Sequence, residues 1–140
     1  MNAFGQLLLL PSDLTSPDIA AAAAALAAEI SESRIQLDII AHRDGPREST
    51  LANRTLEDLG RLPVKIIADG RLDNPAIVQE FYEDHIAPVL LRGQSVVLLV
   101  RVSMAGALRR LIDPNAADTT VGRPELFRFD RELWPIPFRP

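Results

Sequence analysis

The sequence predicts a single α/β domain, and three observations lead to that fold class. Its 140 residues match the usual size of one domain. Short apolar runs of strand length alternate along the chain with longer segments that have the apolar spacing and the capping residues of helices. No internal repeat and no linker divides the chain. With 47% hydrophobic and 24% charged residues the composition is ordinary for a globular protein, so a buried core is expected.

The first part of the chain predicts two strands that flank a helix. Gln6–Leu10 is a short apolar run that ends at a proline, as expected of a buried strand that leads into a turn. Ser16 suits the N-cap of a helix and Pro17 its first position, so the alanine-rich stretch predicts a helix that extends to about Ser31. Residues 35–42 then alternate between apolar and polar side chains, which predicts a strand with one buried face.

The later elements follow from the same signals. A cap residue precedes most of the expected helices, glycine or proline ends or bends them, and apolar runs mark the strands. In chain order we expect a helix from Ser49 or Thr50 to Gly60, a strand over Val64–Ala68, a helix from Asn74 to Gly93 with a kink at Pro88, a strand over Ser95–Val102, a helix over Met104–Ile112, a polar loop over Asp113–Pro124 and a strand over Leu126–Phe129. The continuous apolar run Val96–Val100 predicts that its strand is central and covered on both faces.

Composition excludes several classes of function. The chain has 19 acidic and 15 basic residues, a net charge of −4, which argues against a nucleic-acid surface or a polybasic membrane anchor. Cysteine is absent, so disulfides, thiolate nucleophiles and zinc-thiolate sites are excluded. His42 and His85 are the only histidines, too few for a three-histidine metal site, and no metal site is expected. No apolar run is long enough to cross a bilayer and the first residues do not resemble a signal peptide, so a cytoplasmic location is expected.

The second half of the chain resembles the nucleoside diphosphate kinase family. Phe81–His85 is similar to that family's F-Y-x-x-H helix, and Gly93–Val100 to its central strand. Ala107–Asp113 is similar to the family's arginine-containing helix, and Pro114–Arg123 to the loop that follows it. The opening Leu7–Asp13 is similar to the family's first strand and its K-P-D turn.

The resemblance implies a fold and a domain organisation. The fold would be α/β (α+β), with a ferredoxin-like βαββαβ core, an antiparallel sheet and helices on one face. The chain would form one nucleoside diphosphate kinase-like domain over residues 1–140, with an insertion at about 43–72, where the match is poor. The regular alternation of strands and helices also permits an open α/β sheet built from crossover units.

The same resemblance implies a function without the family's own chemistry. The segment after Arg123, where the family has its catalytic histidine, contains no histidine, so nucleoside diphosphate kinase activity is not expected and the catalytic residues are unknown. The implied function is binding of a nucleotide or of another phosphorylated or anionic small molecule. No cofactor is evident from the sequence, and a magnesium nucleotide is the one that the resemblance allows. Two alternatives remain: a non-catalytic scaffold or regulatory domain that self-associates, and a pocket that catalyses different chemistry on an anionic substrate.

Candidate ligand-binding residues follow from the family's phosphate-binding positions. Arg109 and Arg123 match two of these, and a pair of guanidinium groups could clamp a phosphate; the alternative is that they form salt bridges with nearby acids such as Glu125. Tyr82 and His85 are weaker candidates, because an aromatic at helical spacing is more often core and a histidine beside acidic residues is more often a surface group.

Self-association is the last expectation from the sequence. Family members form oligomers, and two apolar segments would need a cover, the row Ile35, Leu37 and Ile39 and the tail from Trp134 to Phe138. The sequence therefore predicts a homo-oligomer.

Overall fold

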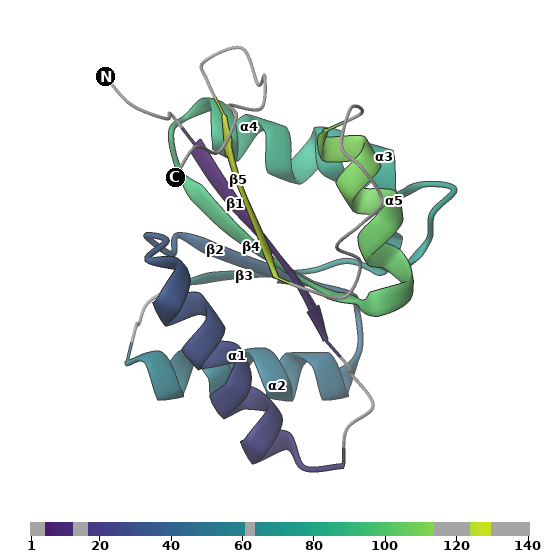
Figure 1. The fold of residues 1–140 in the computed structure, drawn as a ribbon. Coiled ribbons are helices and arrows are strands. Elements are labelled where there is room, and N and C mark those ends of the chain that lie inside the picture. Colours follow the sequence, from purple (N-terminus) through teal and green to yellow (C-terminus); the bar gives the residue numbers. More distant parts are fainter. Residues whose placement is uncertain (1–4, 13–16, 61–63, 114–123, 130–140) are drawn as a thin grey trace.

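The computed structural model of this protein describes residues 5–12, 17–60, 64–113 and 124–129. These residues form a five-stranded sheet with helices on both faces (Figure 1). The strand order is β3-β2-β4-β1-β5. The strands are β1 (Gly5–Ser12), β2 (Ile39–His42), β3 (Lys65–Ala68), β4 (Ser95–Arg101) and β5 (Glu125–Phe129). Strands β1 to β4 are parallel, and β5 runs antiparallel to β1.

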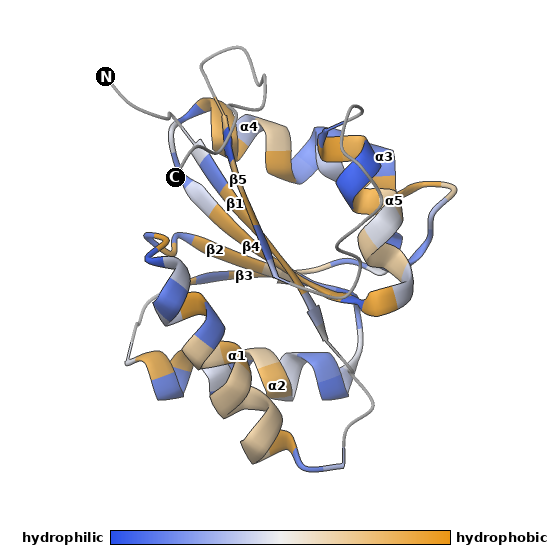
Figure 2. Ribbon diagram, viewed as in Figure 1, coloured by the Kyte–Doolittle hydropathy of each residue, from blue (hydrophilic) through white to orange (hydrophobic). Residues whose placement is uncertain are grey.

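The helices divide between the two faces of the sheet (Figure 1). One face is covered by α1 (Ile19–Ser33) and α2 (Pro46–Leu59). The other face is covered by the 3-10 helix η1 (Gly70–Asp73), by α3 (Val78–Phe81), by the π-helical turn η2 (Tyr82–Ile86), by α4 (Ala87–Leu91) and by α5 (Val102–Ile112). Figure 2 shows the resulting layers, with apolar residues concentrated in the sheet and on the helix faces that pack against it.

Alternation along the strands produces two cores, one on each side of the sheet. Leu7 and Leu9 of β1 pack with the α3–α5 layer, whereas Leu8 and Leu10 pack with α1 and α2. Strand β4 is buried from Ser95 to Val100, because it lies in the middle of the sheet with a helical layer on each side. The central position predicted for this strand is confirmed.

The α/β fold class is confirmed, but the ferredoxin-like core with an antiparallel sheet is wrong. Helices cover both faces, and every pair among β1 to β4 is parallel. Each of the crossovers from β1 to β2, from β2 to β3 and from β3 to β4 contains a helical segment, as parallel pairing requires. Apolar periodicity marks a strand but not the direction of its partner, so the pattern was equally compatible with the open α/β sheet.

Several element boundaries also differ from the expectations. The first helix begins at Ile19, and the carboxylate of Asp18 caps it by accepting from the Ala21 amide at 3.0 Å. The second begins at Pro46, earlier than Ser49. In place of the long helix expected between Asn74 and Gly93, the structure has a turn followed by α3, η2 and α4.

The row Ile35, Leu37 and Ile39 is buried within the chain, Ile35 and Leu37 beneath α1 and α2 and Ile39 on the opposite face. It therefore gives no reason to expect an oligomer. The other apolar segment, Trp134 to Phe138, lies outside the described residues, and self-association stays a prediction. Among the described residues no helix is both long and apolar enough to span a membrane.

Candidate functional site

The carboxyl edge of the parallel strands is the natural place for a ligand in this architecture. All four parallel strands end at this edge. The chain leaves β1 and β2 toward α1 and α2, and leaves β3 and β4 toward η1 and α5 on the other face. Neighbouring strands in the order β3-β2-β4-β1 therefore send the chain to opposite faces of the sheet, the arrangement that in open α/β sheets places ligands beside the carboxyl ends of the strands.

A cluster of four charged side chains lies at this edge, and we call it the edge cluster. Arg43 directly follows β2, and Arg101 is the last residue of the adjacent strand β4. Arg43 Nη1 donates to Asp73 Oδ2 at 3.1 Å and Arg43 Nη2 to Glu48 Oε1 at 3.1 Å. Arg101 Nε lies 3.6 Å from Asp73 Oδ1, an ion-pair distance. Two guanidinium groups from adjacent strands thus face the two oxygens of one carboxylate.

Glu48 is fixed beneath Arg43. It lies in the first turn of α2 and only 2% of its side chain is exposed. The helix begins after Gly45, and a methyl group at that position would overlap the Glu48 carboxylate, so glycine is what allows the carboxylate to fold back over the helix start. The hydrogen bond from Arg43 to Glu48, followed by that to Asp73, raises the pKa of Arg43 above its ordinary value, and the guanidinium stays charged.

Three buried nitrogen atoms, two in the edge cluster and one on the residue before Arg43, have no hydrogen-bond partner among the described residues. They are Nε of Arg43, Nε of Arg101 and Nε2 of His42. His42 is fully buried, and its Nδ1 donates to the carbonyl oxygen of Arg43 at 2.6 Å. Buried polar atoms are normally paired, so this edge has hydrogen-bonding capacity that the described residues do not use.

A second charged group lies at the end of β3. Arg71 donates to both oxygens of Asp69, and its Nη1 donates to Asp84 Oδ2 at 2.9 Å. The hydrogen bonds that Arg71 donates to the Asp69 carboxylate are the main cause of the lowered pKa of Asp69. His85, on η2, places Nε2 3.7 Å from Asp69 Oδ2. The carboxylates and the guanidinium of this group satisfy one another, which makes it a structural connection between β3 and η2.

Of the predicted ligand residues, Arg109, Tyr82 and His85 lie in the described part of the structure. Arg109 lies in the last turn of α5, about 10 Å along the helix from its start, given a rise of about 1.5 Å per residue. Its Nε donates to Glu125 Oε1 of β5 at 2.7 Å, and it is almost fully buried. Arg123 lies outside the described residues. Binding of a ligand by this pair of arginines is untested and stays a prediction.

The two weaker candidates lie on the π-helical turn. Tyr82 is largely buried against the core, and burial raises its pKa to about 12. His85 stacks obliquely on Phe81, with ring centroids 5.4 Å apart, and pairs with Asp69 as described above. These contacts give both side chains structural partners, and their participation in ligand binding is also untested.

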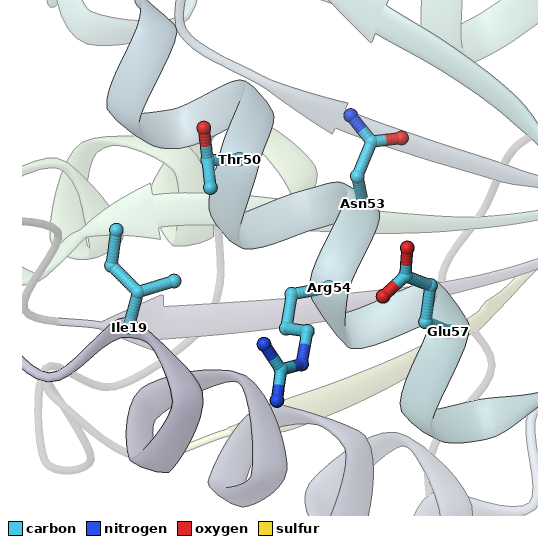
Figure 3. Close-up of a pocket in the computed structure, with 5 residues that line it drawn as sticks. All are labelled: Ile19, Thr50, Asn53, Arg54 and Glu57. Carbon is cyan, nitrogen blue, oxygen red and sulfur yellow. The ribbon is translucent and has the colours of Figure 1, made fainter.

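A polar pocket of about 330 Å³ opens between α1 and α2 (Figure 3). It is lined by Ile19, Thr50, Asn53, Arg54 and Glu57. Thr50 and Asn53 donate to carbonyl oxygens of their own helix, so their donors are already used. Within the described part of the chain, no group of three or more histidine and acidic side chains could hold a metal ion.

Sequence reasoning missed Arg43, Asp73 and Arg101. Arg101 is the last residue of a strand, Arg43 directly follows one, and Asp73 lies in the turn of helix after another, and ligand-binding residues gather at such strand ends in a parallel sheet. That signal is informative only when the strands are known to be parallel. The antiparallel sheet that we expected would have placed these residues at different edges.

Comparison with known proteins identifies the fold. No family model matches the sequence, and no curated protein is similar enough to count as a relative. Among solved structures, a phosphoglycerate mutase from Plasmodium falciparum matches with a TM-score of 0.65 at 12% sequence identity. The match covers 94% of this chain and 86% of the mutase chain.

Two phosphatases have the same fold. The protein histidine phosphatase SixA, in complex with tungstate, has a TM-score of 0.64 at 12% identity, over 94% of this chain and 92% of its own. A mycobacterial glucosyl-3-phosphoglycerate phosphatase matches with a TM-score of 0.56 at 13% sequence identity. This match covers 91% of this chain and 93% of the phosphatase chain. At these identities the likeness establishes a shared fold, that of the phosphoglycerate mutase and histidine phosphatase structures.

This likeness overturns the resemblance to nucleoside diphosphate kinases. The family assignment was wrong, and so was the function derived from it, a diverged kinase-like nucleotide-binding protein, together with its scaffold and new-chemistry alternatives. The resemblance depended on the order of common features, namely an apolar central strand, a following helix with arginines and a polar loop. A different α/β topology also contains these features. A magnesium nucleotide as cofactor is untested and now lacks the support of that family.

Proposed function

We propose that this chain is a phosphatase-like protein that takes the phosphoryl group of its substrate or ligand at the edge cluster. The observation that supports this most directly is the convergence of Arg43 and Arg101 on the two oxygens of one carboxylate. Guanidinium groups recognise phosphate oxygens through the same geometry. The Nε atoms of both arginines make no hydrogen bond among the described residues, so each retains a donor for such a group.

The surrounding structure favours an anion at the same edge. Helix α5 is 11 residues long and begins directly after Arg101, without a side-chain cap on its first amides. The partial positive charge of its N-terminus therefore adds to that of the two arginines. The proteins with this fold support the same class of ligand, since one is bound to tungstate, a tetrahedral oxyanion, and two others are named for phosphoglycerate compounds.

The histidines limit how a phosphoryl group could be transferred. A histidine nucleophile needs one ring nitrogen free to face the phosphorus atom. His42 is fully buried, and His85 pairs with Asp69 outside the edge cluster. The geometry therefore supports oxyanion binding more strongly than transfer through a phosphohistidine, and turnover is a separate measurement.

Titration calorimetry with tungstate and with orthophosphate tests the proposal. Arg101→Ala should weaken binding by about 10- to 100-fold, since one charge-assisted hydrogen bond contributes about 1.5–3 kcal/mol. Arg43→Lys is the better second variant, because it retains a charge opposite the buried Glu48 but loses the planar fork, and it should bind more weakly than the wild type. Hydrolysis of p-nitrophenyl phosphate measures turnover in the same proteins.

The matched control is Arg54→Ala, which removes an equal charge from an exposed position on α2, 3.8 Å from Asp58. It should leave oxyanion affinity unchanged. Equal affinities in the wild type, Arg101→Ala and Arg43→Lys would show that the edge cluster does not bind the oxyanion.

A further inference from the structure

Asp73 occupies the position between Arg43 and Arg101 that a phosphoryl group would take. One carboxylate oxygen accepts from Arg43 Nη1 at 3.1 Å, and the other lies 3.6 Å from Arg101 Nε. A phosphoryl group bound between the same guanidinium groups would present its oxygens to the same donors. Asp73 and a bound oxyanion would therefore compete for these two side chains.

The two carboxylates that contact Arg43 differ in their freedom to leave it. Glu48 is enclosed at the start of α2, with 2% of its side chain exposed. Asp73 has 24% of its side chain exposed and is the last residue of η1. Its neighbour Leu72 is buried in the core and anchors the backbone of η1. A change of rotamer at Asp73 would thus release the carboxylate without moving the helix.

The net charge of the edge cluster decides whether an oxyanion is attracted to it while Asp73 is in place. Two guanidinium groups and two carboxylates leave the edge cluster neutral as it stands. A phosphate or tungstate dianion that enters while Asp73 remains nearby meets a like charge at short distance, which opposes binding. Removing the negative charge of Asp73 leaves one positive charge in excess and both arginines available.

We propose that Asp73 is an internal competitor that occupies the oxyanion position of the edge cluster and must be displaced before a phosphorylated ligand binds. The inference rests on the proposed function, because it assigns the regulation of that same site. A ligand would bind only when its phosphoryl group outcompetes this carboxylate. The site would then select against weakly bound or singly charged anions.

Titration of Asp73→Asn with tungstate tests the inference. Asparagine keeps the shape of the side chain and removes its charge, so tungstate should bind about tenfold more tightly or better than to the wild type. Asp73→Ala, which also removes the competing oxygens, should likewise bind tungstate more tightly than the wild type. Far-UV circular dichroism and the melting temperature show whether each variant is folded. If one variant does not fold, the tungstate affinity of the other still tests the inference.

Asp84→Asn is the matched control. It makes the same change of charge in a carboxylate that pairs with Arg71 and is 61% exposed, so tungstate affinity should stay within about twofold of the wild type. Equal gains in Asp73→Asn and Asp84→Asn would overturn the inference, because the effect would then reflect net charge alone. Weaker binding by Asp73→Asn would also overturn it and would make Asp73 a residue that positions the arginines.

The outcomes separate this inference from the proposed function. One outcome is that the wild type binds tungstate, Arg101→Ala binds it more weakly and Asp73→Asn binds it no more tightly than the wild type. Oxyanion binding at the edge cluster is then supported, and competition by Asp73 is overturned. If the wild type binds no tungstate but Asp73→Asn does, the competition is supported in its strongest form. If neither protein binds tungstate, both proposals fail.

Discussion

Glu48 and Asp73 contact the same guanidinium, and their surroundings give them different roles. Glu48 is buried at the start of a long helix, where removing its partner would leave an uncompensated charge. Asp73 ends a single turn of 3-10 helix and is partly exposed. Both residues offer a carboxylate to Arg43, but burial makes Glu48 a permanent partner, whereas an oxyanion can replace the partly exposed Asp73.

Tyr82 allows a direct test of burial at the residue scale, because it is the only tyrosine of the chain. Burial raises its pKa to about 12, from the 10.0 of a solvated phenol. Since the folded state disfavours the phenolate, the contribution of Tyr82 to stability is complete below pH 10.0 and is lost as the pH rises toward 12. Absorbance of tyrosinate at alkaline pH should therefore show a midpoint near 12 while circular dichroism remains native. A midpoint near 10 in the folded protein would contradict the burial of this ring.

At the scale of elements, the segment from η1 to α4 shows how short pieces can replace one helix. It contains a 3-10 turn, two short α-helical pieces and a π-helical turn in 22 residues between Gly70 and Leu91. Buried residues such as Leu72, Phe81 and Ile86 come from successive pieces and enter the same core. The changes of helix type keep the apolar side chains on the sheet while placing Asp73 at the carboxyl edge.

The contact between α5 and β5 gives a prediction at the same scale. Arg109→Ala removes the 2.7 Å bond to Glu125 and leaves that carboxylate without this partner, so the free energy of unfolding should fall by about 1–3 kcal/mol. Affinity for tungstate should not change. Urea unfolding and titration calorimetry measure the two effects.

Arg92→Ala, at an exposed position at the end of α4, is the control and should alter stability by less than about 0.5 kcal/mol. If Arg109→Ala instead weakened oxyanion binding at unchanged stability, the clamp with Arg123 would gain support.

At the scale of the whole molecule, the sheet has a protected centre and two different edges. β4 is buried on both faces and pairs with β1 and β2. β3 pairs only with β2 among the described residues, and its first and last residues are exposed. The order of the strands therefore predicts a gradient of local stability from β4 outward.

Hydrogen exchange of the native protein tests this gradient. Amides of β4 should exchange only through global unfolding, whereas those of β3 should exchange earlier, through local opening of the sheet edge. Mass spectrometry of peptides from the two strands, sampled over a time course, distinguishes them. Protection of β3 equal to that of β4 would indicate that another surface covers this edge, as the expected homo-oligomer could.

The sequence by itself determined the α/β class, most of the strands and the central position of β4, because these follow from local apolar periodicity and from capping residues such as Gly60. It also determined that a thiol or three-histidine site is excluded. These properties depend only on neighbours along the chain.

Only the tertiary structure decided the direction of the strands and the position of the site. Arg43, Asp73 and Arg101 are 58 residues apart at the extremes, and nothing local to any of them indicates the other two. They meet because parallel pairing of β2 with β4 brings two strand ends to one edge, and because η1 returns over that edge. The physical reason is that strand direction is set by how the crossover helices pack on the sheet, which involves contacts that are distant in sequence.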